Sequence, residues 1–325
     1  MIVRTPDSPP RELADLLPPA LCDQLDRLDL KSRRVLRGRL PGERRSRRRG
    51  RSVEFDDHRP YRPGDDLRHI DWNAYARLDR LFIKLFLEEE DLALHVLVDV
   101  SASMDASGGD RPTKRIAALR LAMMLGYVAL VNQNRLTVRT IGDVETRAPI
   151  GPLRGRRSVE RLAAEALKAA GRPTPPVGSS VPLIDDARRF AMSRPDRGIC
   201  VILSDFLHEE DPAEALRLCA AAGGRGSPMD GLCIQVLDPT EVDPAQARAD
   251  GLVGDLQLID AERGLARPVT VGDALIRRYR EAFERRQARG VAAARASAMR
   301  WMTMTTDDDP GTFVVRALRA AGVVG

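Results

Sequence analysis

The stretch LHVLVDVSASM, residues 94–104, joins a run of apolar residues to a regularly spaced polar ending. Residues 94–98 are apolar apart from His95, which predicts a strand that is buried on both faces. Asp99 ends the run, and Ser101 and Ser103 follow it at intervals of two. The sequence therefore places one carboxylate and two hydroxyls on the loop that leaves a buried strand.

From residue 93 onward, short apolar runs alternate with amphipathic segments of helical length. This alternation predicts an α/β fold with a doubly wound, mostly parallel sheet that is covered by helices on both faces. The expected strands are 93–100, 135–142, 198–206, 231–238 and 300–306. The expected helices are 113–132, 159–171, 182–193, 211–222, 273–297 and 311–321.

Three segments are expected along the chain. Residues 1–51 read as an N-terminal helix followed by a basic arm, residues 52–90 as a small β-rich module, and residues 91–325 as the α/β domain. The module mixes acids and arginines at short spacing, which predicts an internal ion-pair network that holds the module against the sheet. Trp72 and Tyr75 are expected to be packing anchors at that contact.

The basic arm dominates the charge of the chain. The 325 residues carry a formal net charge of +5, yet residues 31–51 hold eleven Lys or Arg and one Glu, so the remainder is acidic. Such a block can neutralise phosphates on nucleic acid or meet an anionic surface, and this is the alternative function for the protein. The block contains no aromatic residue for stacking on bases, and a solvated arm explains it equally well.

Cysteine usage and hydropathy favour a soluble, cytoplasmic protein. The four cysteines, at 22, 200, 219 and 233, form no C-x-x-C pair, so neither a structural disulfide nor a zinc site is expected. No run approaches the 18 or so apolar residues of a membrane helix, and the first residues lack the apolar core of a signal peptide.

Two further segments place oxygen ligands beside those of the first loop. Ser204 and Asp205 end the predicted strand 198–206, and the loop VGSSVPL offers Ser179 and Ser180 before a helix. Carboxyl ends of parallel strands meet at one edge of a sheet, where ligands bind in α/β proteins. Alone, the first loop is explained by turn chemistry, but three such loops favour a site for a hard cation such as Mg²⁺.

The D-x-S-x-S spacing resembles the metal-ion-dependent adhesion site of von Willebrand factor A domains. The resemblance implies that Asp99, Ser101 and Ser103 hold a divalent cation together with Asp205 of the third loop. Ser180 stands where that family has threonine, and Ser179 takes the role if the loop is shifted by one. Phe206 stands where such domains usually have glycine after the aspartate.

The run EFDDHRPYRPGDDLRHIDWNAYAR, residues 54–77, resembles the signature of the bacterial domain of unknown function 58 family. The resemblance implies a von Willebrand factor A-like fold preceded by a β-rich insertion, and a frequent association with MoxR-type AAA+ ATPases. The expected function is metal-bridged protein binding, in which an acidic residue of the partner completes the metal shell. The choice among Mg²⁺, Mn²⁺ and Ca²⁺ and the oligomeric state stay open.

Catalysis is not expected. A haloacid-dehalogenase-like phosphotransferase needs a second acid two residues after the first, and that position is Ser101. The sequence lacks a G-x-x-x-x-G-K-[ST] phosphate loop. The four histidines are scattered, with His95 expected in the core, and only His208 follows Asp205 closely enough to suggest a mutant.

Overall fold

The computed structural model describes two compact units. One consists of residues 35–91, and the other combines residues 1–34 with residues 92–325. The described residues are 9–32, 54–87, 92–106, 111–145, 148–208, 210–223, 228–244 and 254–325. Within these ranges, no helix has the length and apolar character needed to cross a bilayer.

The larger unit is built on a six-stranded sheet with the order β10-β7-β6-β3-β4-β5. Every neighbouring pair is parallel except β4 and β5, which are antiparallel. This confirms the predicted doubly wound, mostly parallel α/β fold. The strands are β3 (Ala93–Asp99), β4 (Arg135–Ile141), β5 (Ile150–Leu153), β6 (Gly198–Ser204), β7 (Asp230–Leu237) and β10 (Met299–Thr305).

The three central strands explain why their sequences are continuous apolar runs. Every residue of β3, β6 and β7 is buried, because helices cover both faces of the sheet. His95 lies in β3 as expected for a core residue, with its Nε2 2.9 Å from the carbonyl oxygen of Asp196.

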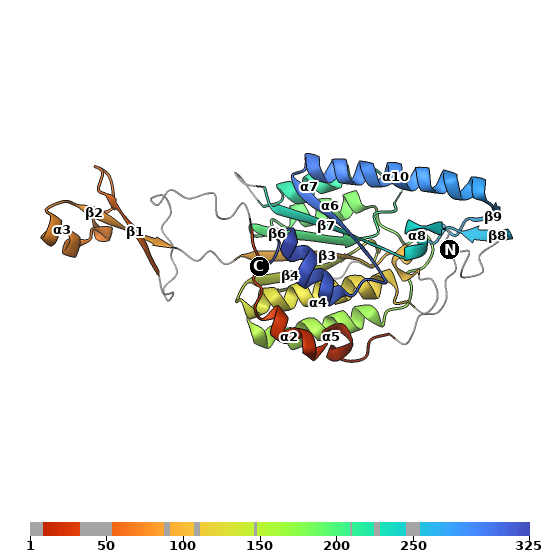
Figure 1. Ribbon diagram of the computed structural model, residues 1–325, viewed down its shortest axis with the longest axis horizontal. Coiled ribbons are helices and arrows are strands. Elements are labelled where there is room, and N and C mark those ends of the chain that lie inside the picture. The colour runs from red at the N-terminus through yellow and green to blue at the C-terminus, as the bar shows by residue number, and fades with distance from the viewer. Residues whose placement is uncertain are drawn as a thin grey trace. The chain divides into compact units, whose positions relative to one another are not determined.

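The helices form two layers, one on each face of the sheet (Figure 1). One layer holds α6 (Leu183–Met192), α7 (Ala213–Ala221) and α10 (Asp273–Ala296), and the other holds α4 (Lys114–Val131) and α5 (Val159–Ala170). The unit is completed by η3 (Ala102–Asp105), η4 (Arg156–Ser158), α8 (Pro239–Val242), the antiparallel hairpin of β8 (Gly254–Ile259) and β9 (Ala266–Val271), α11 (Pro310–Thr312) and η5 (Phe313–Leu318).

The N-terminal helices belong to this unit. Helices α1 (Leu13–Leu16) and α2 (Pro19–Leu25) bury Leu16 and Leu25. The hydroxyl of Tyr127 on α4 donates a 2.7 Å hydrogen bond to Asp26. The first predicted boundary therefore differs from the observed division, because the apolar face of residues 13–25 is buried with the α/β domain.

The smaller unit pairs β1 (Glu54–Pro60) with β2 (Phe82–Leu87) and carries η2 (Leu67–His69) and α3 (Trp72–Leu78) between them. The acidic residues of the signature form ion pairs and helix caps within this unit. Arg59 makes a bidentate ion pair with Asp65, both contacts at 2.7 Å, while Asp66 and Asp71 cap η2 and α3. Sequence reasoning missed these capping roles.

Within the smaller unit, Trp72 is 61% exposed and Tyr75 is 40% exposed. They lie at spacing i, i+3 on one face of a seven-residue helix, and none of that helix is buried. Their rings make an edge-to-face contact, at 6.2 Å between ring centroids. Their expected role as packing anchors against the sheet stays a prediction.

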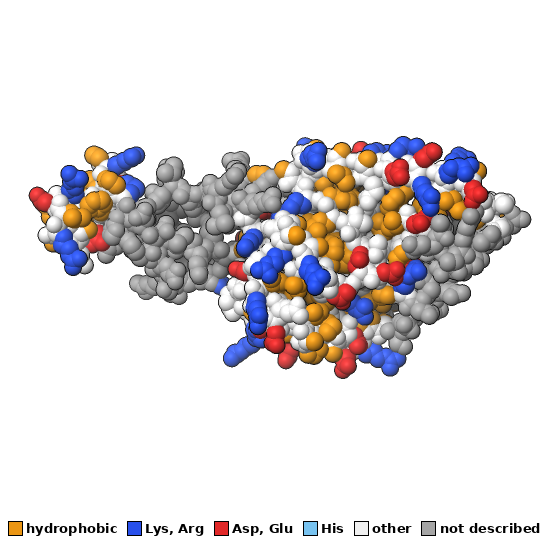
Figure 2. Space-filling view, viewed as in Figure 1, with side chains coloured by type: hydrophobic (Ala, Val, Ile, Leu, Met, Phe, Trp, Pro, Cys, Tyr) orange, Lys and Arg blue, Asp and Glu red, His pale blue; other side chains and the backbone are white. Residues whose placement is uncertain are grey.

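Most of the basic arm, residues 33–51, lies outside the described residues. On the face shown in Figure 2, basic and acidic side chains of the described part of the larger unit are interspersed among hydrophobic ones. That face therefore carries no extended surface of a single charge sign.

Candidate metal centre at the carboxyl edge of the sheet

Asp99 lies at the end of β3, beside the end of β6 where Ser204 and Asp205 lie. The chain moves from β3 to β4 on one side and reaches β6 on the other side later. The point between β3 and β6 is therefore the topological switch point, the expected ligand crevice of an open α/β sheet. The structure thus brings the first and third predicted loops together.

Asp99 is buried and accepts hydrogen bonds on both carboxylate oxygens. Its Oδ1 accepts from the Ser101 backbone N–H at 2.9 Å, and its Oδ2 accepts from the Ser204 hydroxyl at 2.5 Å. Gly142, after β4, comes so close that a Cβ there would lie 2.4 Å from Asp99 Oδ1. Its φ of +86° also favours glycine. The carboxylate is therefore held in one orientation.

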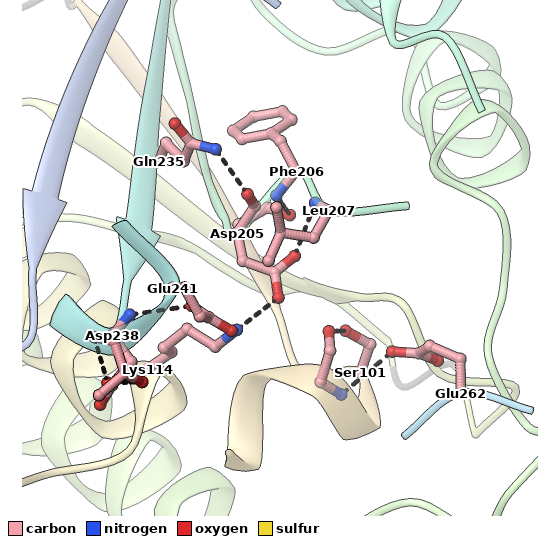
Figure 3. A network of polar contacts seen from close by, with 12 residues as sticks. Ser101, Lys114, Asp205, Phe206, Leu207, Gln235, Asp238, Glu241 and Glu262 are labelled. Carbon is pink, nitrogen blue, oxygen red and sulfur yellow. Dashed lines mark hydrogen bonds and ion pairs between the residues drawn. The ribbon is translucent and has the colours of Figure 1, made fainter. Parts of the chain in front are cut away.

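Asp205 is completely buried and forms an ion pair with Lys114 (Figure 3). Lys114 Nζ lies 2.7 Å from Asp205 Oδ2 and 2.6 Å from Glu241 Oε1. Asp205 Oδ1 accepts from the Leu207 backbone N–H at 3.0 Å, and the Gln235 amide donates to the Asp205 carbonyl at 2.9 Å. These contacts fix both the side chain and the backbone of Asp205.

Lys114 is unusual in its position, because it starts α4, where the helix dipole disfavours a cation. Burial alone would also lower its pKa, but the charges of Asp205 and Glu241 outweigh burial and raise the pKa above its usual value. Burial raises the pKa of Asp205, but the charges of Lys114 and His208 outweigh it and hold that pKa at about 2. The Lys114–Asp205 pair is therefore ionised.

Glu241 is shared between the ion pair and the backbone. Its Oε2 accepts from the Asp238 N–H at 2.9 Å, and Asp238 caps the same short helix, α8. Burial raises the pKa of Glu241, and the charge of Asp205 adds to this, against the opposing effect of Lys114. Glu241 is therefore the weaker acid of the two that contact Lys114.

His208 places its Nε2 3.3 Å from Asp99 Oδ2. Burial opposes charging of the imidazole, but the hydrogen bond to Asp99 and the charges of Asp99, Asp205 and Glu262 raise its pKa to about 9. The side chain also has the geometry of a metal ligand with Asp99 and Asp205, with the three ligand atoms within 4.8 Å of one another. With its pKa raised in this way His208 is a cation at neutral pH, whereas only the neutral imidazole can coordinate a metal ion.

The remaining predicted ligands surround this centre. The hydroxyls of Ser101 and Ser103 lie 3.2 Å apart, and the Ser103 N–H donates to Glu262 Oε1 at 3.0 Å (Figure 3). Ser180 forms a β-bridge with Asp143, directly after Gly142, so the second loop runs beside the strand end that touches Asp99.

The Ser179 hydroxyl donates to the carbonyl of Pro176 at 2.7 Å. A donating hydroxyl keeps its oxygen lone pairs for a cation, so this contact leaves the choice between Ser179 and Ser180 for the threonine position open.

Phe206 adopts a left-handed conformation, with φ of +50°. Bulky residues rarely adopt it, and glycine does so without strain. The Phe206 ring packs against Trp301 at 4.6 Å between centroids, and its N–H donates to the Ser204 hydroxyl at 3.0 Å. The turn that glycine makes in the resembled domains is therefore made here by a packed phenylalanine.

The donor set fits a hard divalent cation. The carboxylates of Asp99 and Asp205 and the hydroxyls of Ser101 and Ser103 are the oxygen ligands that such ions prefer. A further observation supports the fit: Glu262 Oε2 is buried and has no hydrogen-bond partner, although its neighbouring oxygen is bonded. An acceptor left in this state is normally satisfied by an ion or water.

Ser204, Asp99 and His208 do not form the relay of a serine hydrolase. The Ser204 hydroxyl is completely buried and donates to Asp99, and His208 contacts the same Asp99 oxygen. In a hydrolase the histidine lies between the serine and the acid and takes the proton of the serine. Here the carboxylate lies between them.

The family model described as "Protein of unknown function DUF58" matches residues 57–292. The chain belongs to the DUF58 family. The match includes β3, β6 and the hairpin β8–β9, and so covers the whole candidate centre.

The DUF58 relatives match almost the full chain. The proteins named "Uncharacterized protein Rv1480" from Mycobacterium tuberculosis and "Uncharacterized protein Mb1516" from Mycobacterium bovis are each 30% identical over 312 residues, which is 95% of this chain and 92% of theirs. A solved structure, the conserved hypothetical protein BatB from Bacteroides thetaiotaomicron, aligns with a TM-score of 0.39 and 11% identity over 70% of this chain and 98% of that one.

Three charged residues of this DUF58 centre escaped sequence reasoning: Lys114, Glu241 and Glu262. Lys114 is the first residue of an apolar helix, where a charged residue is usually read as solvent-exposed. Glu241 completes the D-x-x-E capping box of Asp238-Pro239-Thr240-Glu241, and that motif was the available signal for its position. Glu262 lies in a hairpin turn and carries no such signal.

Proposed function

We propose that this DUF58 protein is a non-enzymatic, metal-dependent protein-binding module. Asp99, Ser101, Ser103 and Asp205 hold a divalent cation, Mg²⁺ being favoured by the oxygen donors, with Ser180 as a further hydroxyl. When bound, the cation supplies a positively charged position to which a carboxylate of a partner binds better than a neutral oxygen does. No covalent step is involved.

The observation that carries the proposal is the convergence of two buried carboxylates from adjacent strands. Asp99 and Asp205 offer oxygens within 4.8 Å of each other, at the point of the sheet where α/β proteins bind ligands. Burying two acids together is unfavourable without compensating cations. Lys114 and His208 supply part of that compensation, and a divalent cation is the ligand for which the hydroxyls of the first loop are suited.

A hollow beside the centre is lined by apolar and charged side chains together. Leu183, Phe206 and Ala215 form its apolar part, and His208 lines it together with two acids, Glu210 and Asp211. An apolar side chain of the partner would fit this hollow, whereas its acidic residue would bind at the cation.

The family resemblance favours a MoxR-type AAA+ ATPase as the partner, with this protein as an adaptor in the assembly or remodelling of other proteins. The proposal places this work in the cytoplasm, in keeping with four free cysteines.

The test is co-purification of a MoxR-type ATPase, identified by mass spectrometry, with immobilised protein in Mg²⁺ or in EDTA. The wild type should retain the ATPase in Mg²⁺ and lose it in EDTA, and Asp99→Ala should not retain it in either. Asp185→Ala is the matched control, because the Asp185 side chain is 46% accessible and forms an ion pair with the neighbouring Arg188 at 3.0 Å.

Circular dichroism should show that Asp99→Ala remains folded. Retention of the ATPase by Asp99→Ala, or retention that ignores EDTA, would rule out the metal-bridged function. Capture of nucleic acid that ignores both changes and disappears with salt would move the function to the basic arm.

A further inference from the structure

The tip of the hairpin β8–β9 reaches the candidate metal centre. Asp260 shapes this tip: its backbone N–H donates to the Leu265 carbonyl at 3.0 Å, and its carboxylate accepts from the Glu262 N–H at 2.9 Å. Gly264 takes a left-handed φ of +67°, which closes the turn. The turn holds Glu262 at the position nearest the first loop of the site.

The tip is docked on two of the three loops of the site. Glu262 Oε1 accepts from the Ser103 N–H at 3.0 Å, and the Glu262 carbonyl accepts from the Gly178 N–H at 2.9 Å. A Cβ on Gly264 would lie 2.8 Å from Val177, so the glycine allows a close approach to the second loop. These contacts direct the Glu262 carboxylate toward the Ser103 end of the centre (Figure 3).

The Glu262 carboxylate has the properties expected of a ligand without its ion. Oε1 is hydrogen-bonded, whereas Oε2 is buried and has no partner within the described structure. The charge of Glu262 also acts on His208, which contacts Asp99. The carboxylate is therefore electrostatically part of the centre, although it comes from a separate hairpin.

We propose that Glu262 fills the position that an acidic side chain of the partner takes at the metal centre, so that the partner binds by replacing the hairpin tip. The inference rests on the proposed function. The partner feature that it specifies is a glutamate or aspartate presented on a loop, which takes over the contact with the Ser103 N–H.

The hairpin is suited to leave without unfolding the domain. It is a two-stranded sheet of its own, and such hairpins are only marginally stable alone. All the residues of β9 are exposed or half-buried, and Ile259 and Leu265 at the tip are 52% and 55% exposed. For β9 and the tip, displacement therefore disturbs little buried apolar surface.

The expected effect follows from competition within one molecule. If the tip is docked in nine molecules out of ten, only about one tenth of the protein is open to an external carboxylate, and the apparent affinity falls about tenfold. Removal of the Glu262 carboxylate should therefore raise the apparent affinity for an external carboxylate about tenfold.

The experiment uses Mn²⁺ as a paramagnetic probe and acetate as the external carboxylate. Electron paramagnetic resonance measures Mn²⁺ binding to the full chain, and water-proton relaxation of the Mn²⁺-loaded protein is then titrated with acetate. Glu262→Ala should bind acetate about tenfold more tightly than the wild type. Glu262→Gln keeps an acceptor for Ser103 but not the charge, so it should lie between the two.

Glu281→Gln is the charge-matched control. Its carboxylate is exposed on α10 and lies 3.9 Å from Arg285, so it should behave as the wild type. Hydrogen exchange at Gly178, whose N–H donates to the Glu262 carbonyl, should accelerate in the wild type when acetate is saturating, which reports release of the tip.

The outcomes separate the two proposals. Failure of the wild type to bind Mn²⁺, or Mn²⁺ binding that survives Asp99→Ala, overturns the proposed function and this inference with it. Normal Mn²⁺ binding with equal acetate affinity in wild type, Glu262→Ala and Glu281→Gln overturns only the inference about Glu262.

Discussion

Replacement of Lys114 by methionine removes the central charge of the buried network while keeping an unbranched side chain of similar length. The Lys114 side chain is 0% exposed and lies 2.7 Å from Asp205 and 2.6 Å from Glu241. Methionine keeps the length of the side chain, so the lost free energy of unfolding comes mainly from the charges.

The size of the loss in unfolding free energy depends on the charges that remain buried after Lys114 is replaced. Asp205 remains completely buried, and among the described residues its side chain accepts one further hydrogen bond, from the Leu207 N–H. Breaking a buried pair by removing one partner costs about 3–5 kcal/mol. The charge of His208, which also acts on Asp205, offsets part of that cost. Glu241 adds less, because burial already raises its pKa and it can take up a proton.

Urea denaturation followed by far-UV circular dichroism at neutral pH measures the loss. Lys114→Met should lower the free energy of unfolding by about 3–5 kcal/mol. Adding Asp205→Asn should recover more than adding Glu241→Gln, because Asp205 holds the charge more firmly.

Lys168→Met is the control, since Lys168 is 61% exposed and its pair with Glu165 is a surface contact. It should cause no measurable loss. A loss below about 1 kcal/mol in Lys114→Met, or one no larger than that of Lys168→Met, would refute the argument that the ion pair is buried and ionised.

Gly142→Ala should lower the free energy of unfolding by ~1–2 kcal/mol, because alanine is strained in the left-handed backbone conformation of Gly142. It should also weaken Mn²⁺ binding, because the new methyl group would collide with Asp99. A normal Mn²⁺ affinity measured by calorimetry would contradict this. Ser204→Ala should weaken Mn²⁺ binding more than it changes thermal unfolding, since it frees Asp99 Oδ2 from a 2.5 Å hydrogen bond that orients it; unchanged affinity would show that orientation is set elsewhere. The hydrogen bond from the Arg59 guanidinium is the main cause that lowers the pKa of the Asp65 carboxyl to about 2. The ionised Asp65 therefore stabilises the folded state fully above pH 3.8, its pKa in the unfolded chain, and this stabilisation is lost as the pH falls toward 2. Carboxyl ¹³C shifts should show this titration in the wild type and a higher midpoint in Arg59→Gln, which stays below 3.8 because the Arg62 N–H still donates to Asp65; equal midpoints would disprove the pairing.

The sheet could be predicted because its determinants are local. Residues 93–99 form β3 as expected, since seven consecutive buried positions leave a continuous apolar run in the sequence. The position of Asp99 and Asp205 at one edge followed from the same reasoning, because strand ends in a parallel sheet share an edge. Neither apolar run indicates which strand lies next to it in the sheet, so only the structure shows that β3 and β6 are neighbours.

The charges that control the centre could not be predicted, because their partners are remote in sequence. Glu241 and Lys114 are 127 residues apart, and Glu262 and Ser103 are 159 apart. A lysine before an apolar helix and a glutamate in a turn look like ordinary surface residues until tertiary contacts bring them to buried acids. Sequence patterns of this kind point to the proposed oxygen ligands on strand ends, whereas Lys114 and the proposed competing carboxylate of Glu262 come from a helix start and a hairpin tip. The centre therefore combines a predictable set of ligands with charges from remote segments, and the two Glu262 variants and Lys114→Met test those remote charges separately: one by affinity for a carboxylate, the other by stability.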